Sequence, residues 1–145
     1  MENDNVILTE LSKMSREIFR VFKIRCGDSV ELSLTNEQIG LLFKIAKTDK
    51  DVIQKDLADC LGKDKSTILR LTDALEKNDL VRRVTDKNDR RKSHLMITKK
   101  GNRVLEQHMK TMNNLMAELE QGLTESDLQT FFKVVNHLKN KASIL

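Results

Sequence analysis

The scarcity of helix-breaking residues constrains the fold of this chain most, since its 145 residues include no proline and five glycines. Both residue types interrupt helices, proline by removing a backbone donor and glycine by its conformational freedom. Hydrophobic residues make up 39% of the chain and charged residues 33%, which allows one core beneath an ionic surface. We therefore expect a mainly α-helical protein of one domain, or of one domain with appended helices.

The N-terminal segment is expected to form one long amphipathic helix, from about residue 6 to residue 25. Apolar residues recur there at spacings of three and four, and a second apolar stripe runs beside the first. A helix with so wide an apolar face is expected to pack against two partners. Gly27 and Asp28 are expected to end this helix.

A capping box predicts the start of a second helix. The Thr35 hydroxyl can accept a backbone N–H, and Gln38, three residues later, can accept from the backbone of Thr35 in return. The apolar face of this helix is expected to consist of Ile39, Leu42, Phe43 and Ala46.

Two short helices are expected next, joined by a tight turn. The first runs from about residue 54 to residue 61 and stops at Gly62, and the second starts at Asp64, a good N-cap. Two helices joined by a turn that contains glycine are typical of a helix-turn-helix motif. The inward-facing positions of the second helix are expected to be Ile68, Leu71, Leu75 and Ala74.

A β-hairpin is expected directly after the helix-turn-helix. Residues 80–85 and 93–97 are short runs of β-branched and apolar residues, separated by the charged segment 86–92. A hairpin in this position is a wing. The expected fold class is thus α with a small β-hairpin wing, that is, a winged helix-turn-helix with long flanking helices.

The C-terminal part is expected to form two helices, the first capped by Thr98 and broken at Gly122, the second capped by Thr124. Their apolar residues recur at heptad spacing. We expect a dimerisation helix in residues 1–34, a DNA-binding lobe in 35–100 and dimerisation helices in 101–145, within a single intertwined domain. The pattern alone also allows an intramolecular cluster of three helices. The heptad positions are Leu105, Met109, Met112, Met116 and Leu119 in one helix, and Leu128, Phe131, Val135, Leu138 and Ala142 in the other.

The order of these elements predicts that the chain binds double-stranded DNA. The second helix of the pair is narrow enough to enter the major groove, where base edges differ most. The charged hairpin tip would then lie about one groove away, where arginine suits a narrow minor groove. The net charge of +4 is only mildly basic, so its distribution matters more than its size. The candidate DNA-binding residues are Lys65, Ser66, Thr67 and Arg70 on the helix, and Asp89, Arg90, Arg91 and Lys92 on the wing.

These segments resemble the MarR (multiple antibiotic resistance regulator) family. The resemblance lies in residues 57–62, 65–71 and 75–77, in Asp89-Arg90-Arg91, and in the run Leu95-Met96-Ile97-Thr98-Lys99-Lys100-Gly101 that follows the wing. It covers nearly the whole chain in order, and the wing signature is its most specific part.

The resemblance implies roles for several residues. Arg91 would enter the minor groove and Asp89 would orient it, while Asp73 and Arg83 would form a supporting ion pair. Near position 79 the family usually has glycine, where this chain has Asn78-Asp79, so we expect a left-handed turn with some strain.

The resemblance also implies a homodimeric regulator, commonly a repressor, whose DNA binding a small-molecule effector relieves. The lack of a signal peptide and of a membrane helix in the sequence leads us to expect a cytoplasmic protein. The alternative is a winged-helix protein-interaction module that does not bind DNA.

Other classes of function find little support. The chain has no glycine-rich phosphate loop and no paired catalytic side chains, so we expect no enzyme, no cofactor and no metal site. The family resemblance also makes His108 a candidate zinc ligand, but we expect it to be an ordinary surface or interface histidine. Cys26 and Cys60 are expected to be free thiols, although Arg25 could lower the pKa of Cys26.

The N-terminus lacks the features of a signal peptide, and no apolar run is long enough for a membrane helix.

Overall fold

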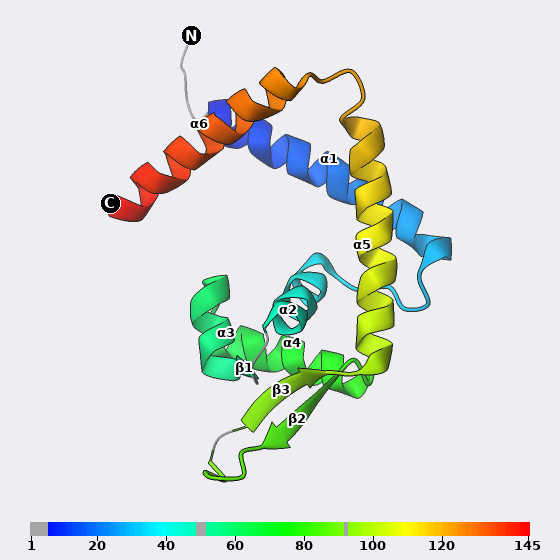
Figure 1. The fold of residues 1–145 in the computed structure, drawn as a ribbon, viewed down its shortest axis with the longest axis vertical. Helices are drawn as coiled ribbons and strands as arrows, with labels where there is room; N and C mark the ends of the chain where they lie inside the picture. The colour runs from blue at the N-terminus through cyan, green and yellow to red at the C-terminus, as the bar shows by residue number, and fades with distance from the viewer. Residues whose placement is uncertain (1–5, 49–51, 92) are drawn as a thin grey trace. The chain divides into compact units, whose positions relative to one another are not determined.

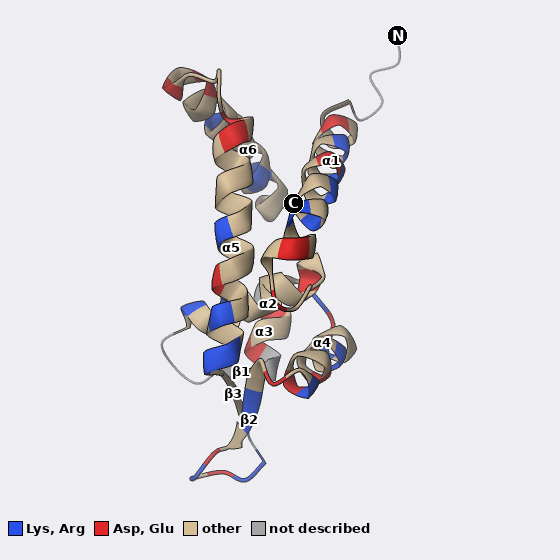
Figure 2. Cartoon of the chain, turned by 90° about the vertical axis from the view of Figure 1, so that its right-hand side faces the viewer, with Lys and Arg blue, Asp and Glu red and all other residues tan. Residues whose placement is uncertain are grey.

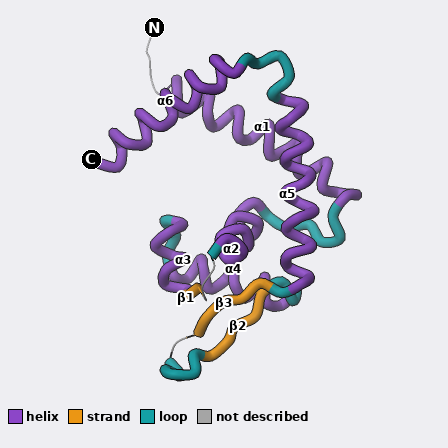
Figure 3. Tube along the Cα trace, viewed as in Figure 1, coloured by secondary structure: helices purple, strands orange, loops and turns teal. Residues whose placement is uncertain are grey.

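A computed structural model of the chain describes residues 6–48, 52–91 and 93–145, with the backbone alone for residues 52–55 and 60 (Figure 1). The chain divides into two compact units, residues 1–112 and residues 113–145. The expected fold class, α with a β-hairpin wing, is confirmed (Figure 3). The boundaries expected at 34 and 100 and the dimerisation roles remain predictions. The helices are α1 (Val6–Ser29), α2 (Asn36–Lys47), α3 (Gln54–Leu61), α4 (Lys65–Lys77), α5 (Lys99–Leu119) and α6 (Glu125–Ile144), and the strands are β1 (Val52–Ile53), β2 (Val81–Thr85) and β3 (Ser93–Ile97).

Helix α1 is longer than the sequence suggests. The prediction that Gly27 and Asp28 end it was wrong, because the helix continues to Ser29. Gly27 does not adopt the positive φ of a helix-ending glycine, and the Ser29 hydroxyl donates to the Arg25 carbonyl at 2.6 Å within the last turn. A single glycine costs a helix about 1 kcal/mol, which does not suffice to stop it.

The predicted caps are confirmed. The Gln38 N–H donates to the Thr35 hydroxyl at 3.2 Å, and the Thr35 N–H donates to the Gln38 side chain at 2.9 Å. Thr124 forms the same kind of capping box at the start of α6. The Asp64 carboxylate accepts the Thr67 N–H at 2.7 Å and so caps α4.

The buried face of α2 differs from the predicted one by part of a turn. Leu41, Leu42 and Ile45 are buried, whereas Phe43 is 37% exposed. The prediction for Phe43 was therefore wrong. The helix turns Leu41 and Ile45 towards the helix-turn-helix core, and the Phe43 ring lies beneath the Lys47 ammonium group, 5.4 Å from it.

One core holds the first unit together around a small sheet. The sheet has the strand order β1-β3-β2, with antiparallel pairing that places Val81 opposite Ile97 and Arg83 opposite Leu95. The sequence did not indicate β1, which pairs with the other edge of β3. Ribbon views show α2, α3 and α4 gathered against the sheet, with the β2–β3 hairpin projecting beyond them (Figure 1). The core includes Leu41, Leu42, Ile45, Leu57, Ile68, Leu71, Leu75, Leu80, Val81, Leu95 and Val104.

The turn between α4 and β2 adopts the predicted left-handed conformation. Asp79 has a φ of +58°, and its carbonyl accepts the Thr98 hydroxyl at 2.6 Å. The Thr98 N–H donates to the Leu80 carbonyl at 3.0 Å, and the Gly101 N–H donates to the Thr98 hydroxyl at 2.9 Å. The first turn of α5 is thereby fixed to the start of the wing.

Replacing Asp79 with glycine is expected to raise the free energy of unfolding by about 0.5–1 kcal/mol, because glycine adopts positive φ without the steric cost of a side chain. The side chain that is lost lies 3.9 Å from Arg82 at an exposed site, where an ion pair contributes little. Urea denaturation measures the change. Asp79→Ala is the control, because alanine keeps the strain, and equal stability of the two variants would contradict the prediction.

The second unit, residues 113–145, contains the end of α5 and all of α6. No residue of α6 is buried, and Phe131 and Phe132 are 43% and 58% exposed. Their rings contact each other edge to face, 5.7 Å between centroids. This unit therefore presents an apolar helix face to its surroundings.

Candidate nucleic-acid interface

Helix α4 presents a polar face over its first two turns. Lys65, Ser66 and Arg70 are exposed there, while Ile68 and Leu71 on the opposite face are buried. Thr67 is half-buried, and its N–H is held by the cap residue that precedes the helix. The structure thus leaves the predicted side chains of α4, apart from the half-buried Thr67, accessible to a partner.

An acidic residue that the sequence analysis missed lies beside this face. Glu37, in the first turn of α2, has one carboxylate oxygen 3.6 Å from the Lys63 ammonium group and 4.0 Å from the Arg70 guanidinium. No local sequence pattern links α2 to α4, so only the tertiary structure reveals this contact.

The wing carries an arginine held by a neighbouring carboxylate. One Asp89 oxygen accepts the Arg91 backbone N–H at 3.0 Å and the Arg91 Nε at 3.2 Å. The Arg91 side chain is 91% exposed, and Arg90 is exposed as well. The loop carries both acidic and basic residues (Figure 2). Lys92, also predicted to bind DNA, lies outside the described residues.

Asp86 organises the base of the same loop, a role that the sequence analysis did not assign. Its carboxylate accepts the backbone N–H groups of Asn88 at 2.7 Å and of Asp89 at 3.3 Å, and lies 2.9 Å from Nε2 of His94. The hydrogen bond from His94, followed by that from Asn88, lowers the pKa of the Asp86 carboxyl. Aspartate side chains often accept the backbone N–H two residues later, so an aspartate at the start of a polar loop is a sequence signal for such a turn.

An ion-pair cluster joins α4 to the wing. The Arg83 guanidinium contacts Asp73 at 2.5 Å and Glu76 at 2.9 Å, and the Arg83 backbone N–H donates to Glu76 at 3.2 Å. The Arg83 side chain is only 27% exposed, so this cluster is partly shielded from solvent. It fixes the angle between α4 and β2, and Glu76 is a member that the sequence analysis missed.

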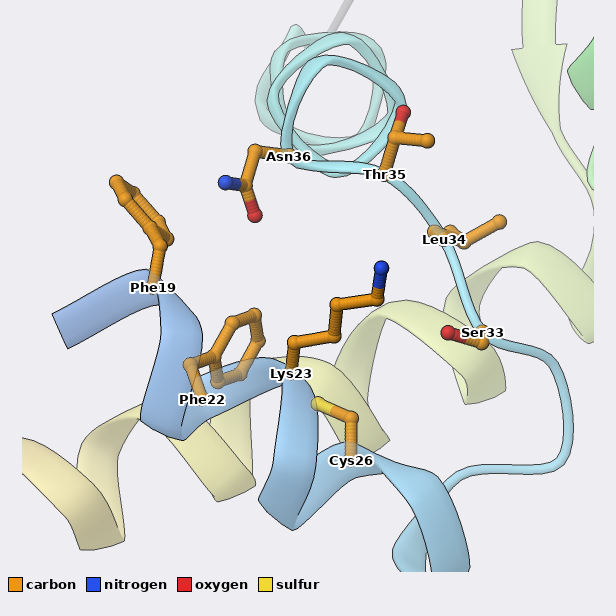
Figure 4. A pocket seen from close by; sticks show the side chains of 8 residues that line it. All are labelled: Phe19, Phe22, Lys23, Cys26, Ser33, Leu34, Thr35 and Asn36. Carbon is orange, nitrogen blue, oxygen red and sulfur yellow. The ribbon is translucent and has the colours of Figure 1, made fainter. Parts of the chain in front are cut away.

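A cavity of about 310 Å³ lies between α1 and the start of α2. Lys23 and Cys26 point into it from α1, opposite Leu34 and Thr35 (Figure 4). A neighbouring apolar cavity of about 260 Å³ is lined in part by Phe43, His108 and Met112. The first cavity is lined by Phe19, Phe22, Lys23, Cys26, Ser33, Leu34, Thr35 and Asn36.

The titratable residues near these cavities are engaged in the structure. His108 is buried, its Nδ1 lies 2.8 Å from the Val104 carbonyl and its Nε2 accepts the Leu34 N–H at 3.4 Å, so both ring nitrogens have protein partners. Burial raises the pKa of the Cys26 thiol, contrary to the suggestion that Arg25 would lower it. The side chain of Cys60 lies outside the described residues. Within the described part of the chain, no three His, Cys, Asp or Glu side chains cluster to hold a metal.

These elements define a winged helix-turn-helix protein with long flanking helices. Residues 34–93 match the model of the MarR family. The resemblance seen in the sequence is confirmed, and this segment belongs to the MarR family. None of the helices in the described ranges has the length and apolar character that crossing a membrane requires.

Solved structures of similar fold span nearly the whole chain. A MarR protein from Peptoclostridium difficile is 24% identical with a TM-score of 0.82, and covers 98% of this chain and 91% of its own. The transcriptional regulator SlyA is 22% identical, with a TM-score of 0.80, and the match covers 96% of this chain and 95% of the SlyA chain. The structure of MarR is 26% identical, with a TM-score of 0.73, and the match covers 99% of this chain and 95% of the MarR chain. The chain thus has the fold of MarR-type transcriptional regulators.

Proposed function

We propose that this chain is a sequence-specific regulator of transcription that binds double-stranded DNA as a homodimer, without enzymatic activity. The observation that carries the proposal is the presence of two exposed basic features in one compact unit, residues 1–112. The first is the polar face of α4 with Lys65 and Arg70, and the second is the wing with Arg91 held by Asp89. The first would enter a major groove and the second the adjacent minor groove.

The exposed apolar side chains of α1 and α6, each taken by itself, support the homodimer. Ile7 and Leu8 on α1 are 56% and 64% exposed, and α6 adds Phe131 and Phe132. A single chain rarely leaves so many large apolar groups in water unless another surface covers them. A symmetric dimer would also place two recognition helices at half-sites about one helical turn, roughly 34 Å, apart.

We propose that the regulator is a repressor relieved by a small effector bound in the cavity between α1 and α2. The cavity of about 310 Å³ has the size of a small-molecule site and includes the ammonium group of Lys23 (Figure 4). Two proteins of similar fold were solved with ligands, namely CouR from Rhodococcus jostii RHA1 bound to p-coumaroyl-CoA and PcaV from Streptomyces coelicolor with its natural ligand. An effector that favours a different spacing of the two lobes would weaken binding to both half-sites.

Binding to mixed genomic duplex DNA over a range of salt concentrations tests the proposal. We expect the dissociation constant to rise steeply with salt, with a log–log slope of at least about 4 in magnitude, because each neutralised phosphate releases counterions. The mass in solution, measured in parallel, should correspond to two chains. Absence of binding at low salt would instead favour a protein-interaction module that keeps the fold.

A further inference from the structure

Glu37 is a carboxylate placed among cations on the surface that the proposed function assigns to DNA. It projects from the first turn of α2, yet its Oε2 lies 3.6 Å from Lys63 and 4.0 Å from Arg70. Lys63 precedes α4 and Arg70 lies in its second turn. One carboxylate oxygen therefore serves two cations from two different elements.

All three side chains remain accessible. Glu37 is 50% exposed, Lys63 37% and Arg70 68%. Ion pairs this exposed contribute little to stability, because water screens them and the long side chains lose freedom when they pair. The place of Glu37 in the first turn of α2 favours a negative charge through the helix dipole, but that interaction requires neither Lys63 nor Arg70 beside it.

The same carboxylate has a large effect on an approaching nucleic acid. On a non-cognate sequence Lys63 and Arg70 can contact only phosphates, which come close to the negative charge of Glu37 and are repelled by it. On the cognate sequence the Arg70 guanidinium leaves Glu37 for a guanine edge in the groove, at the small cost of one exposed ion pair, so the repulsion weighs mainly on non-cognate binding. Specificity gained by penalising the wrong partner needs a repulsive element of this kind.

We propose that Glu37 is a specificity-determining residue, which suppresses binding of the α4 face to non-cognate DNA by holding Arg70 and Lys63 until a base edge replaces it. This inference rests on the proposed function. Glu37 does not contact a base itself. Its effect is on the ratio of affinities for the cognate and for arbitrary sequences.

The test compares Glu37→Gln with the wild-type protein on two probes, mixed-sequence duplex and the fragment that the wild type selects most strongly from its source genome. We expect the affinity of the variant for the mixed duplex to rise roughly threefold to tenfold at low salt. The affinity for the selected fragment should stay within about twofold, so the selectivity falls. Glutamine keeps the size and helix propensity of glutamate, and a thermal unfolding midpoint within about 4 °C of the wild type, which allows for the lost helix-dipole interaction, verifies that the fold is intact.

Two further variants make the result specific to this site. Glu10→Gln on α1 removes the same charge from an exposed ion pair with Lys13 and should leave the selectivity unchanged. In a background that carries both Lys63→Ala and Arg70→Ala, Glu37→Gln should no longer alter the selectivity, since both groups that it restrains are missing.

Equal shifts on both probes, or no shift on either, would overturn the inference, because Glu37 would then be only one more surface charge. Failure of the proposed function looks different. In that case the wild-type protein binds neither duplex at low salt, whereas the inference alone fails if the wild type discriminates and Glu37→Gln discriminates equally well.

Discussion

Replacing Arg91 with alanine is expected to weaken binding to duplex DNA by at least about tenfold, with the fold and the proposed dimer intact. The Arg91 side chain is 91% exposed and, among the residues that the structure describes, pairs with the carboxylate of Asp89, so its loss removes little from the folded protein. A guanidinium in a minor groove gains from the concentrated negative potential there. The proposed dimer carries two wings, so each substitution acts twice. Titration of the selected fragment at fixed salt measures the loss.

A matched control is Arg20→Ala on α1, which removes an exposed arginine also paired with a carboxylate, that of Glu17. This variant should bind DNA like the wild type. Asp89→Ala should give a loss between the two, since it frees Arg91 without removing its charge. An unchanged affinity of Arg91→Ala would exclude Arg91 from the interface and leave α4 alone to account for binding.

The elements that could be predicted from the sequence depend on interactions between near neighbours. The capping boxes at Thr35 and Thr124 link residues three positions apart, so their partners can be read from the sequence directly. The left-handed turn at Asp79 follows from the short polar side chains that tolerate it. Gly62 ends α3 for a comparable reason, with a φ of +61°.

The features that escaped prediction depend on contacts between distant segments. Strand β1 has two residues and no periodicity of its own, and it exists because β3 offers it an edge. The contact of Glu37 with Arg70 joins α2 to α4, and the contact of Asp86 with His94 joins the two sides of the wing. The true core face of α2 likewise depends on which neighbours surround it. These features are set by packing, which a helix period alone does not specify.

Replacing Gly101 with alanine is expected to lower the free energy of unfolding by about 2–3 kcal/mol. A Cβ atom at this position would lie 2.1 Å from the Leu80 carbonyl oxygen and 2.8 Å from the Ile97 side chain. The Leu80 oxygen cannot move away freely, because it also accepts the Thr98 N–H at 3.0 Å. The start of α5 would have to move away from the wing. This is a physical reason for the glycine that stands three residues after Thr98 in the run of residues 95–101.

Gly40→Ala provides the matched control for this substitution. Gly40 lies inside α2 and a Cβ there would meet nothing within 4 Å, so alanine should raise the free energy of unfolding by about 0.5–1 kcal/mol through its helix propensity. Urea denaturation at one protein concentration compares the variants, because the stability of a dimer depends on concentration. Equal stability of Gly101→Ala and Gly40→Ala would contradict the close approach of α5 to the Leu80 carbonyl oxygen. It would also contradict the claim that this approach ties the wing to the helix that follows it.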